Sequence, residues 1–349
     1  MNFSITSLSA KNVMTVSPIL VNQKHLNIFR MFLSCTASIN IFSWGKLSVS
    51  QSYFVNSLDS CIKISNSYEG FSLQLNRLGS FAKDVRIQYT LFANMTNLAI
   101  YDTSSYSVDL YRNIFVNIYS SGNGGSIFKE KGRIYIYSCC FERCRCANSA
   151  TGCVFYLNDL SITSIVFTTV FQCWSSSSCG TCTARIVSSQ TTLKSINSTS
   201  NKNSQYTCVI EPTTCLNAEF SHCHYLNGYS TGICHPLVAS YTMSYINIIK
   251  NTGTVAFFAF YQSSIRLENC FIFQNSYPTL HCYIAGTFVT CFGDVSFSGI
   301  TYRSSISTYN MTFDFPNNCN IVFSIPPTLS MFNRVRSLFF VLSVIFCSF

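Results

Sequence analysis

Apolar and polar residues alternate along several short stretches of this chain. The stretch 134–137 reads Ile-Tyr-Ile-Tyr, and the stretch 108–110 reads Val-Asp-Leu. Successive side chains of a strand point to opposite faces, so a period of two predicts a strand, whereas a helix needs a period of about 3.6 residues. Most of these stretches lead to an aromatic residue, with Asn or Cys two or three positions later. We therefore expect short strands, each closed by a turn.

The alternating stretches recur along the chain, and one marker residue in each gives the spacing. The markers are Phe54, Phe92, Phe115, Phe141, Phe171, Thr199, Tyr225, Ile249, Phe273 and Phe297. Their intervals lie between 23 and 30 residues, except for the 38 residues from Phe54 to Phe92, where we expect an insertion around residues 67–80. Self-similarity at such a period is the signature of a solenoid.

A repeat of this length fits few architectures. Leucine-rich repeats place Leu and Asn differently, propeller blades need about 40 residues or more, and helical repeats need a helical period. A parallel β-helix remains, in which equivalent residues of successive coils lie about 4.8 Å apart. The sequence thus predicts an all-β fold, a right-handed parallel β-helix with coils of 23–30 residues.

Stacking of the coils assigns roles to the markers and their neighbours. Six aromatic markers are expected to be buried in a ladder: Phe54, Phe92, Phe115, Phe141, Phe171 and Phe273. Asn tolerates left-handed backbone angles and suits the turn that ends a strand; such residues are Asn56, Asn94, Asn117, Asn251 and Asn275. Cysteine packs as a small hydrophobe, and six lie near markers: Cys139, Cys140, Cys144, Cys173, Cys223 and Cys270.

One stretch also carries a resemblance to known proteins. The run CCFERCRCANSATGCVFYLNDLSITSIVFTTVFQC, Cys139 to Cys173, resembles coils of pectin-lyase-like right-handed parallel β-helix proteins. It is most similar to the polymorphic-outer-membrane-type repeats of surface proteins from bacteria and protists. The resemblance covers about residues 45–300 and implies a fold rather than an activity. Those families favour a Gly-Gly pair in each coil, whereas this chain has only Gly124–Gly125.

The composition favours strands and argues against nucleic-acid binding. Charged residues make up 10% of the chain, against about 25% in typical domains, so Ser, Thr, Asn and Tyr must cover its outer faces. The net charge of +9 is spread over single cations, and the densest group is Lys129, Lys131 and Arg133. Nucleic-acid binders concentrate their cations in runs or on one face. We therefore expect no nucleic-acid partner.

The cysteines bear on where the protein resides. Nineteen cysteines and the N-glycosylation sequons at Asn2, Asn94, Asn197 and Asn310 favour an oxidising, extracellular setting. The first 21 residues form no clear signal peptide, because Lys11 and Pro18 interrupt the apolar run that one needs. Either the chain leaves the cell by another route or this start is not the natural one. We expect a location at the cell surface or outside the cell.

The ends of the chain are expected to differ from the solenoid. We assign residues 1–26 to an N-terminal segment or cap, 27–315 to the β-helix, 316–337 to a linker and 338–349 to an apolar tail. Pro316, Pro326 and Pro327 cannot donate to a sheet ladder. The tail is shorter than the roughly 20 residues that span a bilayer. It is expected to be a truncated anchor, a cleaved lipid-anchor signal or a strand over the last coil. Membrane association through it should be weak or dependent on processing.

The same fold houses polysaccharide lyases and hydrolases, so the acidic residues are the candidates for a catalytic site. Enzymes of this kind need acidic groups that converge. The aspartates here are dispersed, at Asp59, Asp84, Asp102, Asp109, Asp159, Asp294 and Asp314. Asp84 and Asp109, one coil apart, could still stack. No catalytic residue is assigned, and we expect no three acidic or His side chains to converge beside a cation.

Some Cys and His residues are candidates either for a metal site or for disulfides and stacked thiols. Six ligand-type residues lie close in sequence, namely Cys215, His222, Cys223, His224, Cys234 and His235, and Cys179 and Cys182 form a C-x-x-C pair. Zinc sites usually need two such pairs. In a strand, His222 and His224 would face away from Cys223. Disulfides or stacked thiols are favoured, and neither a metal nor a cofactor is expected.

These patterns favour a non-catalytic structural or adhesive surface protein that presents a β-helical rod to glycans or other proteins. Two alternatives stay open. One is a degenerate polysaccharide lyase or hydrolase of the pectin-lyase-like fold, which stacked acidic residues beside a groove would favour. The other is a fragment of a larger surface protein with no activity of its own.

Overall fold

The computed structural model describes most of the first 297 residues. The described ranges are 3–11, 19–21, 25–34, 41–43, 46–64, 84–147, 152–173, 184–202, 210–212, 217–226, 228–230, 240–253, 256–259, 264–276, 279–282, 288–292 and 296–297. The chain divides into two units, Met1–Cys319 and Asn320–Phe349. The expected linker 316–337 and tail 338–349 lie outside the described residues.

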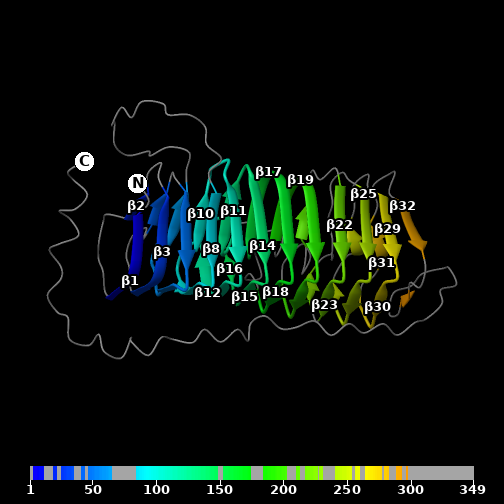
Figure 1. Ribbon diagram of the computed structural model, residues 1–349. Helices are drawn as coiled ribbons and strands as arrows, with labels where there is room; N and C mark the ends of the chain where they lie inside the picture. The colour runs from blue at the N-terminus through cyan, green and yellow to red at the C-terminus, as the bar shows by residue number, and fades with distance from the viewer. Residues whose placement is uncertain are drawn as a thin grey trace. The chain divides into compact units, whose positions relative to one another are not determined.

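Parallel strands stack in ladders, with one strand of each ladder per coil (Figure 1). The first ladder runs through β1 (Phe3–Lys11), β3 (Leu26–Ser34), β5 (Leu47–Ser50), β8 (Asp84–Gln88), β11 (Ser107–Tyr111), β14 (Arg133–Tyr137), β17 (Phe155–Val166), β19 (Ala184–Lys194), β22 (Asn217–Ser221), β25 (Ser240–Ser244), β29 (Ser264–Glu268) and β32 (Phe288–Phe292). Neighbouring strands pair in register, as Val108 does with Val85 and Ile134. The region expected as an N-terminal segment or cap thus supplies β1, which pairs with β3.

Two further ladders complete the coils. The second runs through β6 (Tyr53–Val55), β9 (Leu91–Met95), β12 (Ile114–Ser120), β15 (Cys140–Glu142), β18 (Thr169–Phe171), β20 (Asn197–Thr199), β23 (His224–Leu226), β26 (Asn247–Ile249), β30 (Phe271–Phe273) and β33 (Ser296–Phe297). The third runs through β2 (Ile19–Val21), β4 (Ile41–Ser43), β7 (Ile62–Ile64), β10 (Ile100–Asp102), β13 (Ile127–Glu130), the first halves of β17 and β19, and β21 (Ile210–Pro212).

Short strands extend this framework. They are β16 (Arg145–Cys146) beside β12, the pair β24 (Tyr229–Ser230) and β27 (Thr252–Gly253), and the pair β28 (Ala256–Ala259) and β31 (Thr279–Cys282). Every pairing is parallel, and the described residues contain no helix. The prediction of an all-β parallel β-helix is therefore confirmed.

An aromatic ladder fills the interior of the earlier coils. The rings of Phe54, Phe92, Phe115 and Phe141 are fully buried. Their centroids lie 5.2, 4.9 and 4.5 Å apart in sequence order, with nearly parallel planes. Phe155 then meets Phe141 edge-on at 4.6 Å and ends the stack. Burial and stacking of these four markers are confirmed.

The prediction for Phe171 is wrong. The register pairs Phe141 with Val170, which is buried, and leaves Phe171 half-buried on the outer side of β18. The same offset recurs in later coils, where Ser198, Ile248 and Ile272 occupy the position that we assigned to Thr199, Ile249 and Phe273. The side chain of Phe273 lies outside the described residues. The larger aromatic residue was assigned to the buried position in place of its neighbour. Strand register, and not residue size, sets which side chain faces the interior.

In the described residues, two kinds of turn between strands hold a residue in the left-handed region. The first turn uses Ser7, Arg30, Gln51, Tyr89, Arg112, Ser138, Phe167, Ser195, His222, Tyr245 and Asn269. The second uses Asn56, Asn94, Asn117, Arg143, Gln172, Ser200, Lys250 and Gln274. The expected turn role is thus confirmed for Asn56, Asn94 and Asn117. Asn251 and Asn275 instead follow the left-handed residue and are buried. Positive φ is costly outside Gly and Asn, so the stacked neighbours hold these turns.

At several turns, the buried residue that follows the left-handed residue bonds to the preceding coil. Asn113 accepts from Thr90 N–H at 2.9 Å and donates to Ile87 O at 2.8 Å. Asn251 does the same with Gly228 N–H at 2.7 Å and Tyr225 O at 3.0 Å. Such contacts matter because an unpaired buried N–H is costly.

Cysteine sulfurs occupy equivalent positions. Cys173 Sγ accepts from Cys144 N–H at 3.3 Å and lies 3.5 Å from Phe141 O, to which its thiol donates. Cys139, Cys223 and Cys270 likewise donate to carbonyls of the preceding coil. Cys144 and Cys173 occupy equivalent positions of successive coils, as expected. Cys139, Cys223 and Cys270 share a different position, after the first turn, in coils that are not adjacent. Like the buried Asn residues, these cysteines bond to the preceding coil.

Candidate functional site

Asp84 and Asp109, which could have stacked as residues one coil apart, face different partners in the structure. Asp84 and Asp109 do not stack, because the register places Asp84 beside Ser107 and Asp109 beside Arg86. Asp109 pairs with Arg86, with 3.6 Å between Oδ2 and Nη2. Partial burial raises the pKa of Asp109, and the Arg86 charge opposes that shift. Asp294 and Asp314 lie outside the described residues.

The ligand-type residues near His222 separate onto two sides of the wall. His222 occupies an outward turn and stacks on Tyr245, with ring centroids 5.0 Å apart, while Cys223 is buried inside. Cys179, Cys182, Cys215, Cys234 and His235 lie outside the described residues, as does the side chain of His224. Over the residues that are described, no three His, Cys, Asp or Glu side chains are placed to hold a metal ion.

The interior cysteines are protected as thiols. Burial raises the pKa of Cys139 to about 12 and that of Cys223 to about 11, and it also raises the pKa of Cys173. The thiolate is the reactive form of cysteine, so these side chains are poor nucleophiles. Cys140 differs, since it is disulfide-bonded.

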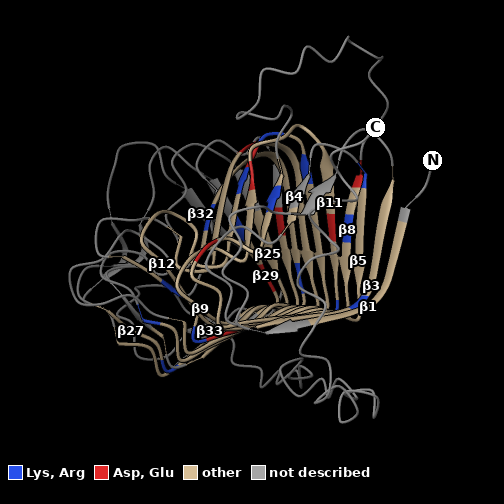
Figure 2. Ribbon diagram, turned by 90° about the vertical axis from the view of Figure 1, so that its left-hand side faces the viewer, with Lys and Arg blue, Asp and Glu red and all other residues tan. Residues whose placement is uncertain are grey.

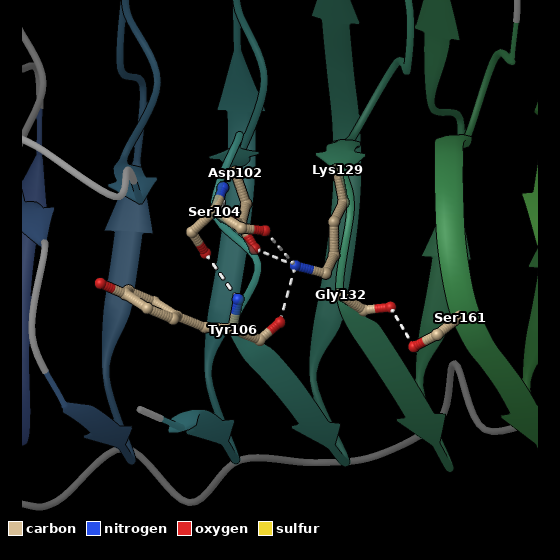
Figure 3. A network of polar contacts seen from close by, with 6 residues as sticks. All are labelled: Asp102, Ser104, Tyr106, Lys129, Gly132 and Ser161. Carbon is tan, nitrogen blue, oxygen red and sulfur yellow. Dashed lines mark hydrogen bonds and ion pairs between the residues drawn. The ribbon is translucent and has the colours of Figure 1, made fainter. Parts of the chain in front are cut away.

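A charged pair is buried between two coils of the solenoid. Lys129 of β13 and Asp102 of β10 are 1% and 0% exposed and are neighbours in the register of the third ladder. Nζ of Lys129 lies 2.5 Å from Oδ2 of Asp102 (Figure 3). Burial raises the pKa of Asp102 and lowers that of Lys129, and their mutual attraction opposes both shifts.

The turn after β10 completes the surroundings of this pair. Ser104 N–H donates to Asp102 Oδ1 at 2.7 Å, and Lys129 Nζ also donates to Tyr106 O at 3.1 Å and to Ser104 O at 3.4 Å (Figure 3). Gly132 lets this turn approach, since a Cβ there would lie 2.5 Å from Tyr106 O. The two charges and their partners thus form a buried, hydrogen-bonded network.

The alternation pattern holds the signal that would have located the pair. Ile100 and Ile127 are buried, so residues two positions later, Asp102 and Lys129, must face the same interior. The neighbouring coils place Ile64 and Leu157 at that position. Lys129 stood out in the sequence only as one of three nearby cations, and its buried position was not predicted.

Aromatic residues gather on the outside at the first turn. We call Tyr89, Tyr111, Tyr137 and Phe167 the aromatic turn patch; their centroids lie 5.5, 5.4 and 5.3 Å apart in that order. The outer pairs meet edge-on, and only Tyr111 and Tyr137 stack. Tyr137 and Phe167 keep 39% and 38% of their surface exposed. The guanidinium of Arg112 lies 5.3 Å from the centre of the Tyr111 ring.

A second outer ladder lies on the third sheet. Tyr101, Phe128 and Tyr156 stack with centroids 4.9 and 5.1 Å apart, and Lys63 and Arg185 cover its two ends at 5.5 Å. Its ring faces are occupied by neighbouring rings and cations, so only ring edges reach solvent. Figure 2 shows the remaining charges scattered among uncharged segments, as the sequence suggested.

Comparison with known proteins adds no family to this description. No protein-family model, no curated protein and no solved structure matches the chain. The structure supports a parallel β-helix, and the finer resemblance to pectin-lyase-like and polymorphic-outer-membrane-type proteins stays a hypothesis. In the described residues no helix is long and apolar enough to cross a membrane.

Proposed function

We propose that this protein is a non-catalytic, adhesive surface protein whose β-helix presents contact residues to glycans or other proteins. The aromatic turn patch carries the proposal. It combines two exposed rings, Tyr137 and Phe167, with the hydroxyl groups of three tyrosines and the nearby Arg112. Tyr and Arg are the side chains that dominate binding at protein contacts, because they offer large rigid area together with polar groups.

The geometry of the solenoid favours repeated weak contacts. The patch crosses four successive coils, each offset from the next by about 4.8 Å, the spacing of neighbouring strands. An extended ligand laid along the coil axis would meet one aromatic residue per coil. Several weak contacts made at once raise the overall affinity without any single deep pocket.

A surface location belongs to the same proposal. The high cysteine content and the disulfide at Cys140 support an oxidising compartment. Asn94, in a sequon, sits at an exposed outward turn, where a glycan could be attached. Surface labelling of intact source cells, followed by detection of the chain, tests the location directly.

Adhesion to immobilised glycans and to immobilised cell-surface proteins tests the contact residues. Replacing Tyr137 and Phe167 together by Ser should weaken binding at least tenfold, because both exposed rings of the patch are lost. Tyr119→Ser is the matched control, since Tyr119 is 38% exposed beside Arg145 but lies on β12, away from the patch.

The result also separates the open alternatives. Loss of binding in the double variant but not in the control, on either surface, supports the proposal and names the ligand class. Equal binding by all three proteins overturns the role of the patch. Release of soluble oligosaccharide from the glycan surface would instead identify a polysaccharide-degrading enzyme.

A further inference from the structure

The buried pair of Lys129 and Asp102 joins two successive coils at one point of the interior. Their strands are neighbours, and Asp102 and Lys129 are direct partners in the register. The contact between Nζ and Oδ2 is 2.5 Å, which brings an amine and a carboxyl group together without intervening water (Figure 3). Such an arrangement suits a reaction between the two groups as well as an ion pair.

We propose that Lys129 and Asp102 condense into an intramolecular isopeptide bond. The neutral Lys129 amine attacks Cγ of the Asp102 carboxylic acid and forms the Nζ–Cγ bond. The bond from Cγ to Oδ2 breaks, and that oxygen leaves as water after taking a proton from the attacking nitrogen. The products are one amide and one water molecule, so the step needs no oxidant, reductant or cofactor.

The contacts of both Asp102 carboxyl oxygens fit this condensation. Ser104 N–H donates to Oδ1 at 2.7 Å, where negative charge would develop in the tetrahedral intermediate. Oδ2, the leaving oxygen, is the one in contact with the amine. Fixed proximity of two reacting groups replaces a bimolecular encounter and lowers the barrier.

The product would also satisfy the buried polar groups. The new amide N–H can donate to Tyr106 O, which already accepts from Nζ at 3.1 Å, and the amide oxygen keeps the Ser104 N–H bond. Two charges removed from water are costly to bury, even as a pair. Condensation removes both charges, and the burial that raises the pKa of Asp102 and lowers that of Lys129 favours the neutral forms that react.

The mass of the full chain, purified from its native source or a recombinant host, decides the proposal. After reduction and denaturation, which remove any contribution from the Cys140 disulfide, the chain should be lighter than its sequence by one water molecule. Trypsin should not cleave after Lys129, and a branched peptide containing both Asp102 and Lys129 should appear. This readout uses the unaltered protein and does not depend on any variant folding.

Two outcomes overturn the proposal. One is a mass equal to that of the unmodified sequence, with normal cleavage after Lys129. The other is loss of water without a branched peptide, which would assign the loss to cyclisation of another aspartate. As a matched pair, Lys131→Met should keep the lower mass because Lys131 is exposed, and Lys129→Met should restore the full mass.

Discussion

The coils from β6 to β15 and those from β18 to β30 share a backbone plan but fill it differently. In the earlier coils Phe occupies the same interior position four times, and the rings stack. In the later coils that position holds Val170, Ser198, Tyr225, Ile248 and Ile272, all buried. The later coils add a hydrogen-bonded Asn pair, with Asn251 N–H donating to Asn275 Oδ1 at 2.9 Å.

The backbone geometry of the coils requires neither stacked Phe rings nor hydrogen-bonded Asn side chains in the interior. Strands in both regions pair in parallel and in register, and both regions keep left-handed residues at equivalent turns. The backbone repeat therefore tolerates aromatic, aliphatic or polar interiors, provided that buried polar groups find partners. The free energy of unfolding, by contrast, should depend on whether the interior side chains are aromatic, aliphatic or polar.

The largest effect is expected from Phe141→Ala. This ring stacks on Phe115 and meets Phe155, so its removal opens a cavity inside the aromatic ladder. We expect the free energy of unfolding to fall by about 3–5 kcal/mol, measured by urea denaturation. Val170→Ala, at the same position one coil later, should cost clearly less; equal losses would show that ring stacking adds nothing to this region.

The next effect concerns the hydrogen-bonded interior of the later coils. Asn251→Ala leaves Gly228 N–H and Tyr225 O without their side-chain partner. An unsatisfied buried group costs about 1–3 kcal/mol, and urea denaturation should register a loss of that order. Asn94→Gly is the control, because Asn94 is exposed and Gly accepts its positive φ. A loss in the control as large as that in Asn251→Ala would refute this assignment.

The smallest effect should be common to both regions, because both use buried thiols. The pKa of Cys139 rises from an ordinary 9.0 to about 12. Above pH 9 the unfolded chain releases this proton while the folded chain retains it, so stability is full below pH 9 and is lost as pH rises toward 12. Melting temperatures from pH 8 to pH 11 should fall more steeply for the native chain than for Cys139→Ser. Parallel curves would contradict the protected thiol.

Much of the fold was predictable because a solenoid repeats its local pattern. Alternation around Ile134 and Ile136, together with coil-length spacing, was enough to predict parallel stacked strands. The exact buried position was not predictable wherever two large apolar residues were adjacent, as at Val170 and Phe171. The register between coils decides such cases, and it is set by contacts with residues far away in sequence.

The candidate sites were harder to predict than the fold. Stacking of Asp84 and Asp109 was left open by the sequence, and the strand register excludes it. The Asp102–Lys129 contact likewise requires knowing which coils are neighbours. The aromatic turn patch also depends on that register, since Tyr89, Tyr111, Tyr137 and Phe167 are widely separated in sequence. A local sequence pattern predicts which face of a strand a side chain occupies, but not which residues of the neighbouring coils it contacts.

The buried turn residues give the solenoid a direction of assembly. In contacts such as those of Asn113, Cys173 and Asn251, the side chain belongs to the later coil, and the backbone groups that it satisfies belong to the earlier coil. During synthesis, the turns of a coil therefore keep unpaired backbone groups until the next coil folds against it and supplies their partners. Folding would therefore proceed sequentially from the N-terminus, and each new coil would stabilise the coil that precedes it.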